Sequence, residues 1–196
     1  LCVIIKSNFK TTDLKISILS TSDDLEKEAK AFDERIEERT KAGFIPDVRR
    51  AVKCEYFYKS FFRDPYLIKL FLQVEINYFL EMLKKYSYPG ARILDVGCGS
   101  GYTSLELARS GYHVTGIDIS SKVIDVAKKT LESNPFKDGF GSLKYHVSSF
   151  DEFDGKFDVV LFCGTIHHIR NPEKTILRAL DMLNPTGLLM CEEPSH

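Results

Sequence analysis

The pattern of apolar and polar positions changes near residue 91 of this 196-residue chain. After that point, short apolar runs alternate with segments whose apolar residues recur at helical spacing. Strands are predicted at 92–96, 112–117, 143–148, 157–163 and 187–192, and helices at 101–110, 120–133 and 172–183. Strands that alternate with helices form right-handed βαβ units. The pattern therefore predicts a parallel sheet covered by helices on both faces.

The first ninety residues are organised differently. Two strand-like runs, at 2–6 and 14–19, precede a mainly helical stretch. Helices are expected from Leu25 to Gly43, from near Pro46 or Asp47, and from Asp64-Pro65 to Tyr86. We therefore divide the chain into an N-terminal hairpin or extension at 1–20, a helical cap at 21–90 and an α/β domain at 91–196.

Composition and charge narrow the classes of function. Hydrophobic residues make up 43% of the chain and charged residues 28%, which is typical of a globular protein with a core. The net charge of −1 provides no basic field, so we expect no nucleic-acid partner. No apolar run is long enough for a membrane-spanning helix. The five cysteines form no CxxC pair, so we expect no metal site and a cytoplasmic, reducing location. Nothing in the sequence indicates an oligomeric state.

The most informative stretch is residues 93–120, "ILDVGCGSGYTSLELARSGYHVTGIDIS". Gly97, Gly99 and Gly101 follow a predicted strand at alternate positions, and Asp118 ends the next strand. Glycines permit a sharp turn and close approach of a ligand, and the following helix presents free N–H groups. A carboxylate at the end of the second strand can accept hydrogen bonds from a ribose diol. The stretch therefore predicts a site for a nucleoside-containing cofactor.

Two cofactor classes use such a loop. The dinucleotide fingerprint reads G-x-G-x-x-G, whereas this loop reads G-x-G-x-G after an acid, Asp95. An acid there disfavours a pyrophosphate and tolerates a cation. "LDVGCGSG" resembles the D/E-x-G-x-G-x-G motif of class I S-adenosylmethionine-dependent methyltransferases, and "GIDIS" resembles their ribose motif. The resemblance covers residues 91–196. It implies an α/β fold with a Rossmann-like, doubly wound, mostly parallel sheet, here with an N-terminal helical cap.

The resemblance also implies cofactor-binding residues. The glycine loop, with Asp95 and Cys98, is expected to hold the methionine part of the cofactor. Asp118, followed by Ile119, is expected to bind the ribose. Cys163 stands at the exit of the fourth strand, where the resemblance implies that the sulfonium lies.

The end of the third strand departs from the family pattern. Many members carry an acid there that contacts the adenine amino group, but by spacing this position is Ser149. Asp151 or backbone groups are the alternatives for that contact. Phe150 is expected either on the adenine face or in the core.

The segment after the fourth strand, "GTIHHI", resembles that of small-molecule methyltransferases of ubiquinone and menaquinone biosynthesis. It does not resemble the N/D-P-P-Y/F motif of methylases that act on amino groups of bases or amides. A small-molecule acceptor is therefore expected. His167 or His168 could take a proton from the acceptor, because histidine titrates near neutrality. The alternative is that these imidazoles only fix the turn or shape the pocket.

Aromatic residues are concentrated at 54–79. One interpretation is a helical core packed on the sheet. The other is a cap over the active site, with Tyr56, Tyr58 and Tyr66 lining the acceptor pocket. The charged run at 26–41 is interpreted as the solvated face of the first helix.

Two other functions stay open at this point. One is a non-catalytic protein that binds S-adenosylmethionine as a sensor or partner subunit. The other is an NAD-dependent oxidoreductase, which Asp95 and the spacing of the glycines disfavour.

The predicted fifth strand, 187–192, poses a question about the edge of the sheet. Members of the family usually continue into an antiparallel pair of strands, whereas this sequence stops at His196. Runs 2–6 and 14–19 either pair beside 187–192, or form a separate hairpin while a C-terminal extension lies beyond His196. The first residue, Leu1, and the abrupt end favour the second arrangement.

Overall fold

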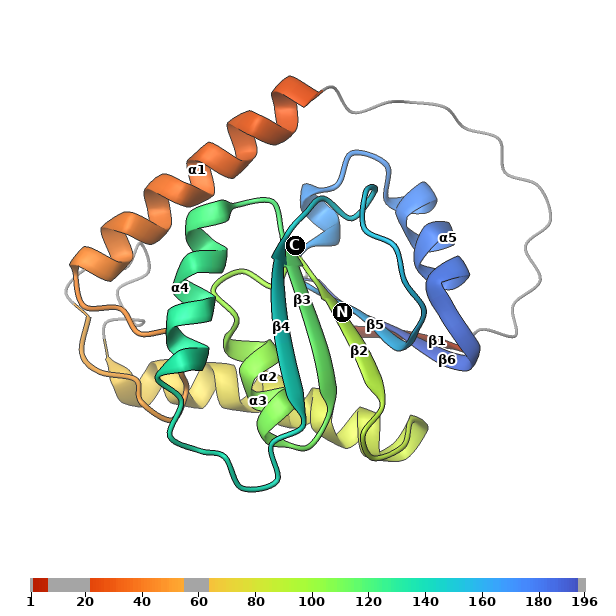
Figure 1. Cartoon of the computed structure of the whole chain (residues 1–196), viewed down its shortest axis with the longest axis horizontal. Coiled ribbons are helices and arrows are strands. Elements are labelled where there is room, and N and C mark those ends of the chain that lie inside the picture. The colour runs from red at the N-terminus through yellow and green to blue at the C-terminus, as the bar shows by residue number, and fades with distance from the viewer. Residues whose placement is uncertain (1, 7–21, 55–63, 194–196) are drawn as a thin grey trace.

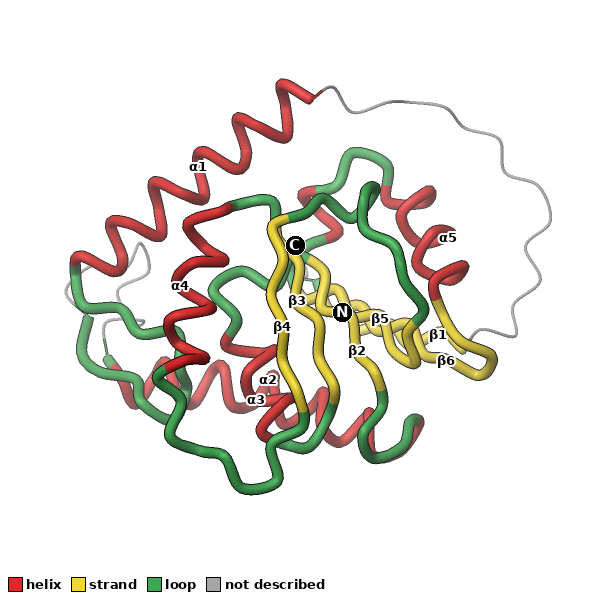
Figure 2. The backbone as a smooth tube through the Cα atoms, viewed as in Figure 1, coloured by secondary structure: helices red, strands yellow, loops and turns green. Residues whose placement is uncertain are grey.

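A computed structural model describes residues 2–6, 22–54 and 64–193. In this part of the chain, one six-stranded sheet has the order β1-β6-β5-β2-β3-β4 (Figure 1). The strands are β1 (Cys2–Lys6), β2 (Arg92–Val96), β3 (His113–Asp118), β4 (Ser142–Val147), β5 (Phe157–Cys163) and β6 (Leu183–Glu192). Strands β2 to β6 are parallel to one another, and the sheet twists from β4 to β1 (Figure 2). The predicted Rossmann-like sheet is confirmed.

Helices cover both faces of the sheet. They are α1 (Ser22–Lys41), α2 (Pro65–Tyr86), α3 (Tyr102–Arg109), α4 (Ser121–Glu132) and α5 (Pro172–Met182). Residues of α2, α3 and α4 share one hydrophobic core with the sheet, and α5 contributes to a second core on the opposite face (Figure 1). The chain runs outward from β2 to β4 and then returns to β5. The order of the strands therefore reverses between β2 and β5, which is where doubly wound sheets bind ligands.

Local signals account for the ends of the long helices. Asp64 accepts a hydrogen bond from the Tyr66 N–H at 2.8 Å, and Pro65 occupies the first turn of α2. Gly43, with φ of 90°, follows the end of α1. No helix among residues 22–54 and 64–193 is long and apolar enough to span a membrane.

The helix expected from Pro46 or Asp47 is absent from residues 44–54, so that prediction was wrong. The buried Asp47 carboxylate instead accepts two hydrogen bonds from Arg109 of α3, each 2.8 Å long. Burial acts to raise the Asp47 pKa, but Arg109 and Arg50 outweigh it and hold the pKa at about 2. The segment is therefore fixed by buried ion pairs to α3 rather than by helical hydrogen bonds.

The N-terminal strand covers the edge of the sheet. β1 pairs antiparallel with β6, from Cys2 opposite Glu192 to Lys6 opposite Leu188. This is the first of the two arrangements that the sequence left open, and the separate hairpin that it favoured is wrong for residues 2–6. The run at 14–19 lies outside the described residues. An antiparallel strand satisfies the backbone groups of β6 that would otherwise be unpaired.

Candidate functional site

The glycine loop joins β2 to α3 at the carboxyl end of the sheet. Gly97 and Gly99 have φ of 66° and 54°, values that other residues rarely adopt. A Cβ at Gly97 would overlap the Thr165 side chain, whose hydroxyl donates to the Val96 carbonyl at 3.1 Å. A Cβ at Gly99 would meet no atom within 4 Å and would project into open space. The loop therefore packs closely on one side and leaves room for a ligand on the other.

Asp118 ends β3 beside this loop. Its Oδ2 accepts from the Gly99 N–H at 3.0 Å, and its Oδ1 accepts from the Ser120 N–H at 2.9 Å. Burial raises the pKa of Asp118, against the opposing effect of these two hydrogen bonds. The carboxylate is thus held in one orientation, and each oxygen keeps a lone pair for a ligand.

A cavity of about 460 Å³ lies over the carboxyl ends of β2, β3, β4 and β5. Its size is that of a small-molecule site. Seven of the residues predicted from the sequence line it, namely Gly97, Gly99, Asp118, Ile119, Ser149, Phe150 and His168. Asp151 also lines it, and Ser149 donates a hydrogen bond to Glu152 at 2.8 Å. Phe150 has a second role in the core, where it packs edge-on against Phe162.

Other predicted residues do not line this cavity. Asp95 is buried beneath the loop and accepts a hydrogen bond from the Ser104 hydroxyl of α3. Burial raises the pKa of Asp95 to about 6. Cys98 is buried, Gly101 is the N-cap residue that precedes α3, and the Cys163 thiol points toward Glu75 of α2. These residues lie in or near the glycine loop but outside the lining of the cavity.

The helix that covers the cavity is α1. Seven of its residues line the cavity, namely Asp24, Leu25, Glu28, Phe32, Arg35, Ile36 and Arg39. The interpretation of 26–41 as a solvated face was therefore incomplete, because one side of the helix faces the cavity. Tyr66, expected in the acceptor pocket, is 71% exposed on α2 and does not line this cavity. Tyr56 and Tyr58 lie outside the described residues.

Polar contacts attach α1 along its length. Asp33 accepts hydrogen bonds from the Ser120 hydroxyl at 2.5 Å and the Lys122 N–H at 3.1 Å, at the start of α4. One turn further along, Glu37 pairs with the Lys122 side chain. Nearer the start of α1, Asp24 pairs with Arg170 at 2.9 Å. These contacts join α1 to both sides of the cavity.

The structure separates the two adjacent histidines. His168 lines the cavity, its Nδ1 lies 3.1 Å from Glu28 Oε1, and its ring packs edge-on against Phe32. His167 does not line the cavity, and its Nδ1 lies 2.6 Å from Glu193 Oε2. Only His168 is therefore placed to meet a molecule in this cavity.

Glu193 explains the position of His167. Its Oε1 accepts from the Thr165 and Ile166 N–H groups at 3.0 and 2.7 Å. Burial acts to raise the pKa of Glu193, but His167 and these N–H groups outweigh it and lower the pKa. His167 and Glu193 thus hold the turn after β5, which is the structural alternative that the sequence left open.

Comparison with known proteins supports the same family. A family model described as a methyltransferase domain matches residues 87–196. The ubiquinone biosynthesis O-methyltransferase of Aromatoleum aromaticum is 37% identical over 102 residues, which cover 50% of this chain and 42% of that protein. The chain spans less than half the length of such relatives.

Solved structures share the fold. Magnesium protoporphyrin IX methyltransferase from Synechocystis PCC 6803 with bound SAM aligns with a TM-score of 0.62 and 20% identity, over 85% of this chain and 75% of that one. The cyclase SpnF aligns with a TM-score of 0.61 and 20% identity, over 86% and 60%. The family match covers more than half of the chain, which therefore belongs to the methyltransferase domain family, among the class I S-adenosylmethionine-dependent methyltransferases.

Proposed function

We propose that this protein transfers the methyl group of S-adenosylmethionine to a hydroxyl oxygen of a small molecule. The observation that carries the proposal is the cavity at the reversal of strand order, with the glycine loop and Asp118 in its wall. The oxygen acceptor is suggested by the O-methyltransferase relative. The absence of a strong basic field favours a small molecule over a nucleic acid. The dispersed thiols favour a reducing, cytoplasmic compartment.

The residues present fit this cofactor. Gly99 leaves open space where any other residue would place a Cβ. Asp118 is oriented by backbone N–H groups and can accept from ribose hydroxyls. Ile119 and Ser149 line the same cavity, and in this proposal they border the adenine. When bound, S-adenosylmethionine supplies a methyl group on a sulfonium, which an oxygen nucleophile can attack.

Two features of this chain serve the transfer. The cavity and the α1 helix over it hold the reactants together and exclude water, which accounts for much of the catalysis in such displacements. His168 accepts the proton that the acceptor hydroxyl loses, and Glu28 lies close enough to stabilise the resulting imidazolium. His167 has a structural role at the turn.

Calorimetric titration with S-adenosylmethionine, S-adenosylhomocysteine and NAD tests the cofactor. We expect the first two to bind and NAD not to bind. Asp118→Ala should weaken S-adenosylmethionine about 10- to 150-fold, because one charge-assisted hydrogen bond contributes roughly 1.5–3 kcal/mol. Asp125→Ala, on the exposed side of α4, is the matched control and should leave the affinity unchanged.

Incubation with methyl-labelled S-adenosylmethionine and a small-molecule metabolite extract tests the transfer. Label should appear in a small molecule while S-adenosylhomocysteine accumulates. Binding without turnover on any acceptor would indicate the non-catalytic alternative, and NAD binding alone would indicate the oxidoreductase.

A further inference from the structure

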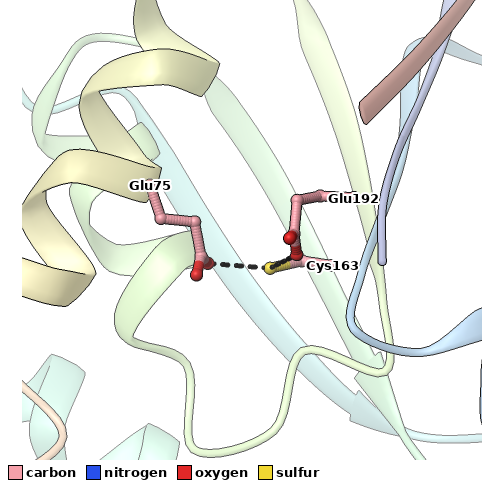
Figure 3. Close-up of side chains that lie close together, drawn as sticks. All are labelled: Glu75, Cys163 and Glu192. Carbon is pink, nitrogen blue, oxygen red and sulfur yellow. Dashed lines mark hydrogen bonds between the residues drawn. The ribbon is translucent and has the colours of Figure 1, made fainter. Parts of the chain in front are cut away.

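Three side chains that are distant in sequence meet behind the proposed cofactor site. Glu75 of α2, Cys163 at the end of β5 and Glu192 at the end of β6 point toward one another (Figure 3). The Cys163 Sγ lies 2.9 Å from Glu75 Oε1 and 4.0 Å from Glu192 Oε2. One potential ligand atom from each residue lies within 4.8 Å of the other two.

These separations suit a small cation. Ligand atoms around tetrahedral zinc, at about 2.0–2.3 Å from the ion, lie roughly 3.3–3.8 Å from one another. The two Cys163 sulfur-to-oxygen distances, 2.9 and 4.0 Å, bracket that range, so small side-chain rotations would bring the sulfur and both oxygens to bonding distance.

The cluster also has an excess of acidic groups. Among the described residues, no Lys, Arg or His pairs with Glu75 or Glu192. All three side chains are only partly exposed to solvent. A divalent cation bound among them would balance the charges of the carboxylates and of the thiolate that forms when the thiol loses its proton.

Tyr102, which follows the glycine loop, lines the neighbouring cavity. Its hydroxyl has no hydrogen-bond partner among the described residues, which leaves it available to a ligand in the cavity.

We propose that Glu75, Cys163 and Glu192 bind one divalent cation, with zinc as the best match. A thiolate ligand favours zinc over magnesium or calcium, which prefer all-oxygen sites. Three protein ligands leave the fourth tetrahedral position open for water or a ligand oxygen. Binding releases the thiol proton, so affinity should rise with pH.

The site adjoins the proposed active site without depending on methyl transfer. Cys163 directly precedes Gly164 and Thr165, and both of these line the cavity, as does Tyr102. A bound ion would therefore link α2 to the ends of β5 and β6 beside the region where the acceptor is expected.

Cobalt(II) titration of the whole chain tests the proposal without an acceptor. Cobalt replaces zinc in thiolate sites and gives a thiolate-to-metal charge-transfer band in the near ultraviolet. We expect that band to saturate at one equivalent and to disappear when zinc is added. Cys163→Ser should abolish it, and Glu75→Gln should weaken binding at least ~100-fold, more than the loss of an outer hydrogen-bond partner usually costs.

Two matched variants serve as controls. Cys191→Ser removes a buried thiol next to Glu192 from the opposite core, and Glu81→Gln removes an exposed carboxylate of the same helix. Both should keep the cobalt band. No thiolate band in the wild-type chain, or an equal loss in Cys191→Ser, would overturn the proposal. If Cys163→Ser fails to fold, Glu75→Gln decides by its affinity, and unchanged cobalt affinity in that variant would also overturn the proposal.

Discussion

At the scale of single residues, the site depends on acids held in different surroundings. Asp118 faces the cavity and is oriented by two N–H groups. Asp95 is fully buried below the same loop with one hydroxyl partner. The Asp118 carboxylate is therefore available to a ligand, whereas the ionisation of Asp95 affects the stability of the fold.

Asp95 should make stability depend on pH. Burial raises its folded-state pKa from 3.8 to about 6. A raised pKa contributes stability that is present below pH 3.8 and lost as the pH rises through about 6. Asp95→Asn cannot ionise and still accepts from Ser104, so it should be more stable than the wild type by about 1–3 kcal/mol near neutral pH.

Urea unfolding at about pH 5 and about pH 8 measures this effect. The stability advantage of Asp95→Asn should be larger at the higher pH. An equal difference at both values would show that the Asp95 pKa is not raised.

The two histidines should differ in their effect on catalysis. His168→Ala should lower turnover roughly 10²–10⁴-fold, the usual contribution of a general base, with S-adenosylmethionine affinity retained. Steady-state kinetics on the acceptor found by labelling, together with calorimetry, would measure both. Full turnover in His168→Ala would rule out the role of His168 as a base.

His167→Ala should instead lower the thermal stability, because Glu193, which holds the turn after β5, loses its contact with the imidazole.

At the scale of elements, α1 contributes few buried apolar side chains, and polar contacts help to hold it over the cavity. Among its described side chains, only Ile36 is buried. Its attachment to α4 centres on Asp33, which accepts from Ser120 and the Lys122 N–H at a helix N-terminus. The position of α1, which forms one wall of the cavity, therefore depends in part on these hydrogen bonds.

Asp33→Ala should loosen this wall. The lost hydrogen bonds contribute on the order of 1–2 kcal/mol, so S-adenosylmethionine affinity should fall about 5- to 30-fold. Glu34→Ala, which makes the same charge change at the exposed neighbouring position, is the control. Calorimetry that gives equal affinities for the two variants would contradict a role for α1 in cofactor binding.

At the scale of the whole molecule, β1 forms one edge of the sheet. β1 covers β6 along five residue pairs, from Cys2 and Glu192 to Lys6 and Leu188. Deleting residues 1–6 should expose the backbone of β6, which lies beside the buried strand β5. We expect the deletion to lower the urea midpoint and to promote self-association, measured by light scattering. A monodisperse variant of unchanged stability would show that β1 is dispensable.

Much of the fold and half of the site were predictable from local patterns. The alternation of strands and helices after residue 91 depends on periodicity within short windows, and the glycine loop and Asp118 depend on short spacings. α2 was likewise indicated by Asp64-Pro65 at its start. The helix expected near Asp47 failed because a buried ion pair with Arg109, 62 residues away, outweighed local propensity.

The sequence by itself determined the order of the strands and helices after residue 91, the class of cofactor and the residues of the loop, because short-range spacing and backbone sterics carry that information. Only the tertiary structure decided that α1 covers the cavity, that His168 rather than His167 faces it, and that β1 pairs with β6. It also decided that Glu75, Cys163 and Glu192 meet. These outcomes depend on contacts between residues far apart in the chain, such as Asp33 with Ser120 and Glu75 with Cys163, 87 and 88 positions apart. No local pattern encodes such contacts, because they arise when separate elements pack together.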